Sequence, residues 1–253
     1  MWHTDGMPAT GGLRARVRAE LMQEIKDEAR RQIAQEGAPS LSLRAIARHL
    51  DMVSSGIYRY FKSRDELLTA LIVDAYEAVG SRVEEADARC ERVDFAGRWS
   101  ACCHAVRIWA LAQPHEYALI YGSPVPGYHA PEETNPPASR VALALVAIIH
   151  DAAAAGELRA PFVAEMSPTL STSATVEAAR LEAIGFNGVP HDAIIRSLTA
   201  WTQLFGAVSF EVFGRVADIV EDVDAIFDQS VRGMRAYVGI VDSQRSPIQS
   251  DTT

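Results

Sequence analysis

The stretch Ser42–Phe61 constrains the fold more than any other part of this chain. It holds two short apolar patterns on either side of the break Asp51-Met52-Val53. The first pattern has apolar residues at i, i+3, i+4 and i+7, namely Leu43, Ile46, Ala47 and Leu50. The second has Ile57 and Phe61 on one face, with Ser54 and Ser55 available to cap its start. Helices this short are unstable alone in water, so the two must pack at a steep angle against a third. The stretch therefore predicts a helix-turn-helix.

The flanking sequence supplies longer helices for this pair to pack against. An apolar residue at every fourth position predicts a helix over Ala15–Glu36, which Gly37 ends. On the other side, Ser63 and Glu66 have capping-box spacing, so we expect a helix from Arg64 to about residue 87.

The remainder of the chain is also predicted to be helical. Further helices are expected over Phe95–Ala112, His115–Tyr121, Ser139–Ala155, Thr169–Ile184, His191–Phe213 and Asp222–Val238. A proline-rich loop is expected over Gly122–Pro137, and a second break over Pro161–Pro168. No alternating pattern long enough for a sheet occurs, so the expected fold is all-α with about nine helices. We expect a helix-turn-helix domain over 13–75, a larger helical domain over 76–241, and disordered tails over 1–12 and 242–253.

The distribution of charge separates these two parts. The whole chain has a net charge of −9, but Leu13–Arg64 has 11 Lys and Arg against 6 Asp and Glu. A basic end on an acidic body favours an oriented approach to a polyanion such as DNA. An ordinary fluctuation of charge along the chain is the alternative interpretation.

Other features of composition indicate the compartment. The first twelve residues lack the pattern of a signal peptide, and no apolar run approaches the length of a membrane span. Three cysteines, of which Cys102 and Cys103 are adjacent, favour reduced thiols. We therefore expect a cytoplasmic protein without membrane contact.

Three motifs in the N-terminal part resemble the TetR family of bacterial transcription regulators. They are Leu43-x-x-Ile46-Ala47, Gly56-Ile57-Tyr58-Arg59-Tyr60-Phe61 and Ser63-Arg64-Asp65-Glu66-Leu67-Leu68. The resemblance implies a homodimeric, all-helical regulator whose larger domain binds a small molecule. Asp51 departs from the family pattern, which usually has glycine at this turn position. Aspartate tolerates a left-handed backbone better than most residues, so the turn is expected to form.

The larger domain is similar to the TetR subgroup with a WHG-type C-terminal domain. The matching stretches are Tyr121–Tyr128 with Ala130, Pro131 and Thr134, and Trp201 with Gly206 and Glu211–Gly214. Phe205 stands where the name of the subgroup expects histidine.

Eight residues are predicted to contact DNA. They are Arg44, Ser54, Ser55, Gly56, Tyr58, Arg59, Tyr60 and Lys62. The family resemblance places a base contact at Arg44, and an arginine can bind guanine through two hydrogen bonds. The serines open the recognition helix, glycine permits close approach, and the tyrosines and Lys62 suit phosphates. For the tyrosines, packing on the surface of the domain is the alternative, and for Arg48 and His49 simple solvation is favoured.

The larger domain is predicted to contain the effector site and the dimer surface. Candidate effector contacts are Trp99, Cys103, Trp109, Tyr117, Tyr121, Tyr128, Trp201 and Phe205, although for each one a place in the core is the alternative. His191–Val238 is the predicted dimer surface. Its expected contacts are Ala200, Leu204, Gly206, Ala207, Val208, Phe213, Ile226, Val231 and Met234.

These predictions together indicate a repressor that binds a pseudo-palindromic double-stranded operator as a homodimer. A small apolar or amphipathic effector of unknown identity would release it. No catalytic residue and no cofactor is predicted. No metal site is predicted either, because the seven histidines lack metal-ligand spacing. Two alternatives remain: a helical enzyme that uses Cys103 and His104, and a helical interaction protein without DNA binding.

Overall fold

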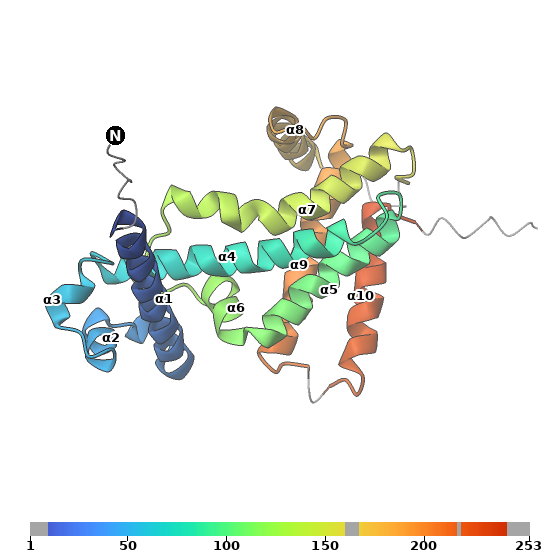
Figure 1. Cartoon of the computed structure of the whole chain (residues 1–253). Coiled ribbons are helices and arrows are strands. Elements are labelled where there is room, and N and C mark those ends of the chain that lie inside the picture. The colour runs from blue at the N-terminus through green and yellow to red at the C-terminus, as the bar shows by residue number, and fades with distance from the viewer. Residues whose placement is uncertain (1–9, 160–166, 217–218, 242–253) are drawn as a thin grey trace, which may run out of the picture. The chain divides into compact units, whose positions relative to one another are not determined.

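The computed structural model describes residues 10–159, 167–216 and 219–241, and within them the chain is helical (Figure 1). The α-helices are α1 (Thr10–Glu36), α2 (Leu43–His49), α3 (Ser54–Ile57), α4 (Arg64–Ala88), α5 (Phe95–Ala112), α6 (Pro114–Tyr121), α7 (Asn135–Ala154), α8 (Pro168–Ala183), α9 (His191–Val212) and α10 (Val223–Val238). Two short 3₁₀ helices, η1 (Ala38–Ser40) and η2 (Glu132–Thr134), complete the list. The described residues form no strand beyond one isolated bridge between Leu158 and Ile240. The all-α prediction is confirmed.

The chain divides into two compact units. Among the described residues, the first unit holds 10–75 and 115–134, and the second holds 76–114 and 135–241 with the gaps given above. One division between the units follows residue 75. His115–Thr134, which the sequence assigned to the larger domain, instead belongs to the first unit.

Charged side chains explain why this later segment belongs to the first unit. On α1, Lys26 and Arg30 bind Asp74 of α4 at 2.8 and 2.7 Å. Arg30 also reaches Glu116 of α6, with its Nε 2.9 Å from the carboxylate. In the loop that follows, the hydroxyl groups of Tyr128 and Thr69 are hydrogen-bonded at 2.9 Å. Interactions between residues far apart in the sequence therefore assemble this unit.

The second unit is built around α5. This helix packs against α7, α9 and α10, and α9 also packs against α7, α8 and α10. One face of α5 is fully covered, including Trp99, Cys102 and Val106. The same face buries Arg98, which binds Asp87 and Asp151 at 2.7 Å each and donates to the carbonyl of Arg92. A buried arginine needs such partners because an unpaired charge in the interior is strongly destabilising.

Several helix boundaries differ from the expected ones. Helix α1 begins at Thr10, so it includes the last three residues of the predicted N-terminal tail. Helix α7 begins at Asn135, inside the expected loop, because Pro136 and Pro137 fall in its first turn, where no amide hydrogen bond is lost. The other predicted tail residues, 1–9 and 242–253, lie outside the described residues, as does most of the predicted break at 161–168.

The expectation that no run approaches the length of a membrane span was wrong for one segment. Residues Glu132–Ala154 are long and apolar enough to cross a membrane by length and composition alone. However, α7 packs on α5 and α9 and buries Val141, Leu145 and Ile148 there. Such packing is typical of a core helix in a folded domain.

Candidate nucleic-acid interface and cavities of the second unit

Helix α2 has one buried and one exposed face. Ser42 caps it by accepting a hydrogen bond from the amide of Ala45, and the amide of Ser42 donates to the side chain of Gln32 on α1. Ile46 and Ala47 are buried, whereas Arg44 is exposed. The cap and the apolar contacts thus fix a helix from which Arg44 points into solvent.

The turn after α2 has the left-handed backbone that the family pattern suggested. Asp51 has φ of 52° and is the one non-glycine residue with positive φ in the described chain. The amide of Met52 then donates to the carbonyl of Ala47 at 2.8 Å and closes the turn. The turn survives the absence of glycine, with a backbone conformation that L-residues adopt at some cost.

Helix α3 is shorter than predicted and is capped differently. It covers Ser54–Ile57, and the residues up to Tyr60 continue as turns. Its N-cap is Val53, which makes no side-chain cap, so the capping role expected for Ser54 and Ser55 was wrong. Both serines instead lie on the first turn of the helix, exposed to solvent.

The residues predicted to contact DNA differ in exposure. Ile57 and Phe61 are buried and anchor the recognition segment, residues 54–62, to the rest of the first unit. Arg44, Ser54, Ser55, Tyr58, Arg59 and Lys62 are exposed, and Gly56 and Tyr60 are half-buried. Tyr58 leaves 43% of its surface in solvent, which is unusual for a tyrosine without a partner surface.

Arg18 of α1 supports the C-terminal end of this segment. Its guanidinium donates to the carbonyl of Arg59 at 3.2 Å and lies 5.1 Å from the centre of the Tyr60 ring. The sequence did not reveal this supporting role. Contacts between residues so far apart in sequence give no local signal.

Three further contacts stabilise the helix-turn-helix and the start of α4. The Ser63 hydroxyl accepts from the amide of Glu66 at 3.0 Å, and the Glu66 carboxylate accepts from the amide of Lys62 at 2.6 Å. The capping-box prediction is confirmed, with the returning bond displaced by one residue. At the C-terminal end of α2, His49 contacts Arg31 of α1 at 2.8 Å, so this side chain is not simply solvated.

The eight predicted effector contacts are divided between the two units. Tyr117, Tyr121 and Tyr128 belong to the first unit, and Trp99, Cys103, Trp109, Trp201 and Phe205 belong to the second. Most of them pack in the interior: Trp99, Cys103, Trp109, Tyr117 and Phe205 are buried. The described residues of the second unit line at least three cavities, and of the eight candidates Trp109 lines one of these three.

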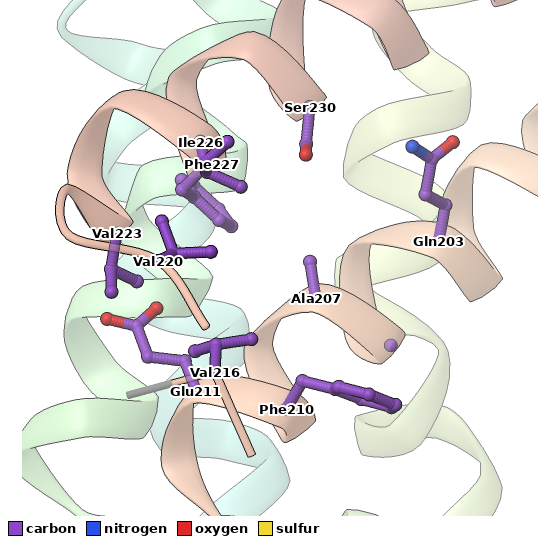
Figure 2. A pocket seen from close by; sticks show the side chains of 11 residues that line it. Gln203, Ala207, Phe210, Glu211, Val216, Val220, Val223, Ile226, Phe227 and Ser230 are labelled. Carbon is purple, nitrogen blue, oxygen red and sulfur yellow. The ribbon is translucent and has the colours of Figure 1, made fainter. Parts of the chain in front are cut away.

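The first of these cavities is a groove between α9 and α10 with a volume of about 400 Å³ (Figure 2). It is largely apolar, with Ala207, Phe210 and Ile226 among its lining residues. Phe210 and Ile226 leave 58% and 52% of their surface exposed. The sequence analysis missed Phe210, although a phenylalanine off the buried stripe of α9 was a signal available to it.

The predicted dimer contacts on these helices require correction. Most of them form the internal core of the second unit: Ala200, Leu204, Val208, Val231 and Met234 are buried. Phe213 and Ile226 are exposed, and Gly206 and Ala207 line the groove. Helical periodicity identifies an apolar stripe, but it does not distinguish the core of one chain from an interface between two.

The geometry at Cys103 and His104 argues against a catalytic thiol. Cys103 is fully buried, and burial followed by the neighbouring Cys102 raises the pKa of its thiol well above the usual range. His104 interacts elsewhere, with Nε2 2.8 Å from the Asp228 carboxylate and Nδ1 2.8 Å from the carbonyl of Ser100. A thiol without an accessible thiolate is a poor nucleophile.

Comparison with known proteins identifies the family. Residues 25–71 match the family described as "Bacterial regulatory proteins, tetR family", and residues 99–234 match "Tetracyclin repressor-like, C-terminal domain". The chain belongs to the TetR family. It is 42% identical over 227 residues to the HTH-type transcriptional regulators Rv1816 of Mycobacterium tuberculosis and Mb1846 of Mycobacterium bovis. In both cases the match covers 87% of this chain and 93% of the relative.

Solved structures agree with this TetR assignment. The crystal structure of the regulatory protein SCO4313 is 32% identical and has a TM-score of 0.70, covering 91% of this chain and all of the other. A TetR-family regulator from Rhodococcus RHA1 has the same fold, with a TM-score of 0.57 at 18% identity over 87% of this chain and 98% of that one. This TetR protein is therefore a helix-turn-helix, DNA-binding transcriptional regulator, and TetR regulators are not enzymes.

Proposed function

We propose that this TetR protein is a dimeric repressor whose binding to a pseudo-palindromic operator is released by a small apolar or amphipathic effector. The observation that carries the proposal is an exposed α2–α3 surface, held on a buried apolar base, in a chain of the TetR family. The proposal further specifies which residues contact DNA, how the dimer forms and how an effector releases it.

The proposed DNA-contacting surface, called the reading surface, combines Arg44 with the exposed residues of the recognition segment. Arg44 can donate two hydrogen bonds to guanine O6 and N7, which discriminate between bases. Tyr58 and Lys62 are assigned to phosphates, which fix the register of the protein on the duplex. The contact between Arg18 and the Arg59 carbonyl supports this surface by limiting movement of the segment beyond α3.

The proposed dimer forms through α9 and α10. Support comes from the apolar groove, from exposed Phe210 and Ile226 beside it, and from Gly206 and Ala207, which permit close approach of helices. An isologous interface of this kind would join four helices, two from each copy. It would also carry two recognition segments on one assembly, as a pseudo-palindromic operator requires.

Light scattering of the purified protein tests the dimer. We expect twice the 27.6 kDa mass of one chain, and we expect Ile226→Asp to reduce it towards one chain mass. Val93→Asp introduces the same charge at an exposed apolar residue outside α9 and α10, so it should leave the mass unchanged. A monomer at micromolar concentration in the unmodified protein would refute this part of the proposal.

Repression and its release are tested with DNA. A footprint of the protein on the promoter of its own gene should cover two half-sites with centres separated by about one helical turn or a multiple of it. Transcription from that promoter in vitro should fall when the protein is added. An effector restores transcription only if it binds the DNA-free conformation more tightly than the DNA-bound one. Stimulated transcription would contradict the assignment as a repressor.

A further inference from the structure

His104 on α5 lines two of the cavities in the second unit. One hollow of about 260 Å³ lies between α5 and α10, and its lining includes Ser100, His104 and Asp228. The other, of about 350 Å³, lies between the C-terminal half of α4 and α5. Its volume is within the range typical of small-molecule sites. We call these two hollows, which share His104, the joint hollow.

The charged lining of this joint hollow is predominantly basic. Four arginines line it, Arg82 and Arg89 from α4 and Arg232 and Arg235 from α10, against two carboxylates. Each carboxylate has a partner within the lining. Glu85 lies 3.5 Å from Arg89, and Asp228 lies 2.8 Å from His104 Nε2. The lining thus has an excess of guanidinium groups, which favours an anion.

The histidine has contacts at both ring nitrogens. Its Nδ1 lies 2.8 Å from the carbonyl oxygen of Ser100, and its Nε2 lies 2.8 Å from the carboxylate of Asp228. The ring of Phe227 packs edge-on against His104 with 5.3 Å between ring centres, so the imidazole is held in place.

The part of the joint hollow between α4 and α5 is lined by apolar as well as charged side chains. The apolar ones include Ala101, Ala105, Ala112 and Trp109. Ile108 also lines it and leaves 66% of its surface in solvent, the highest exposure of any large apolar side chain on α5. Exposed apolar surface beside guanidinium groups suits a ligand with a hydrocarbon tail and a negatively charged head.

We propose that the joint hollow around His104 binds an amphipathic monoanion, such as a linear carboxylate, with its head at Arg232 and Arg235 and its tail along Ile108 and Trp109. The site deepens the proposed effector control, because it names the chemistry of the effector. It uses none of the predicted effector residues except Trp109. It also connects α5 to α10, the helix assigned to the dimer.

Calorimetric titration of the full-length protein with decanoate, below its micelle concentration and without DNA, tests the site. We expect saturable binding, weakened at least tenfold in Arg232→Gln/Arg235→Gln and in Ile108→Asp. Decanol, which has the same tail without charge, should bind at least tenfold more weakly. Arg180→Gln removes an exposed arginine of the same unit outside the hollow and should bind decanoate like the unmodified protein.

Any of three results would overturn the site. They are the absence of saturable decanoate binding, decanoate binding by both hollow variants that equals that of the unmodified protein, and binding of decanol as tight as that of decanoate. Because the double arginine variant and Ile108→Asp probe opposite ends of the hollow, misfolding of one leaves the other informative. Operator binding by the ligand-free protein, followed by fluorescence anisotropy, is a separate measurement. If it fails while decanoate still binds, the proposed function falls and the site stands.

Discussion

Two sets of arginines, one from each unit, have opposite structural roles. In the first unit Arg44 and Arg59 reach into solvent from the helix-turn-helix. In the second, Arg98 and Arg196 are buried, and Arg107 is nearly so, with two nitrogens each 2.7 Å from the Glu211 carboxylate. An exposed arginine is available to a partner outside the chain, whereas a buried one stabilises the fold. We therefore expect substitutions in the first set to change DNA affinity and substitutions in the second to change stability.

The largest effect is expected from Arg98→Met. It leaves Asp87 and Asp151 without their guanidinium partner and should lower the free energy of unfolding by about 3–5 kcal/mol, which is typical when one member of a buried ion pair is removed. Urea denaturation followed by circular dichroism measures this. The double variant Arg98→Met/Asp87→Leu should be less destabilised than Arg98→Met alone. A loss below about 1 kcal/mol in Arg98→Met would mean that this arginine does not stabilise the fold.

Arg44→Ala should produce the reverse result. Its free energy of unfolding should stay within about 0.5 kcal/mol of the unmodified protein, as for other exposed sites. Operator affinity should fall by about 1–3 kcal/mol, the contribution of a two-hydrogen-bond contact to a base. Tyr58→Phe should weaken binding by less. Arg48→Ala removes the same charge from the same helix and serves as the control in gel-shift titrations with non-specific competitor. Equal losses of operator affinity for Arg44→Ala and Arg48→Ala would contradict a specific role of Arg44 in DNA binding.

The pH dependence of stability should reflect the buried pairs. Burial alone would raise the pKa of Asp87, but hydrogen bonds from Arg98 and Arg92 outweigh it and hold the pKa below its usual value. This group therefore stabilises the fold fully above the pKa of an unfolded aspartate, about 3.9. Its contribution is lost as the pH falls through the lowered folded-state pKa. Unfolding free energies measured across the acid range should fall less steeply in Asp87→Asn, and an unchanged slope would refute the assignment.

Gly56→Ala separates the effect of one residue on the stability of α3 from its effect on operator affinity. An added Cβ would meet Val53 at 3.4 Å and Met52 at 3.8 Å, which are ordinary contacts, and Gly56 has no positive φ. Alanine should therefore stabilise α3 by up to about 1 kcal/mol through its higher helix propensity. Operator affinity should nevertheless fall if DNA approaches the backbone there. Thermal unfolding and anisotropy on one preparation give both values, and unchanged affinity would remove Gly56 from the reading surface.

The smallest effect is expected at the turn. Asp51→Gly relieves the left-handed backbone at φ 52° but increases the freedom of the unfolded chain, so the net change should lie within about 1 kcal/mol. Asp51→Val cannot relieve the backbone and should be destabilising by more than that. Denaturation midpoints of the two variants compare them directly, and a tolerated valine would show that the turn has another conformation in solution.

Local patterns predicted much of the helical framework. The apolar spacing and the capping box predicted the starts of α2 and α4, because both depend on residues within one turn of each other. The contact of Arg18 with the Arg59 carbonyl beyond α3 was not predictable in this way, because it joins residues 41 positions apart. The start of α7 was missed for another reason: prolines usually mark loops but are also accepted in a first helical turn.

The candidate sites were predicted less completely than the fold. The exposed surface of α2 and α3 follows from short motifs. By contrast, aromatic residues at helical spacing were predicted to contact the effector, and most of them are buried, as Trp99 and Tyr117 illustrate. The hollow around His104 joins α5 and α10, which are distant in sequence, and the groove containing Phe210 depends on how the consecutive helices α9 and α10 pack.

The sequence alone determined the all-α fold, the helix-turn-helix, its left-handed turn at Asp51 and the resemblance to TetR regulators, because these depend on neighbours within a few residues. The tertiary structure alone decided which apolar residues face the core and which face solvent, and which arginines are paired. It also decided that His115–Thr134 belongs to the first unit. Burial and charge pairing are properties of the packed chain, since they depend on which distant residues meet.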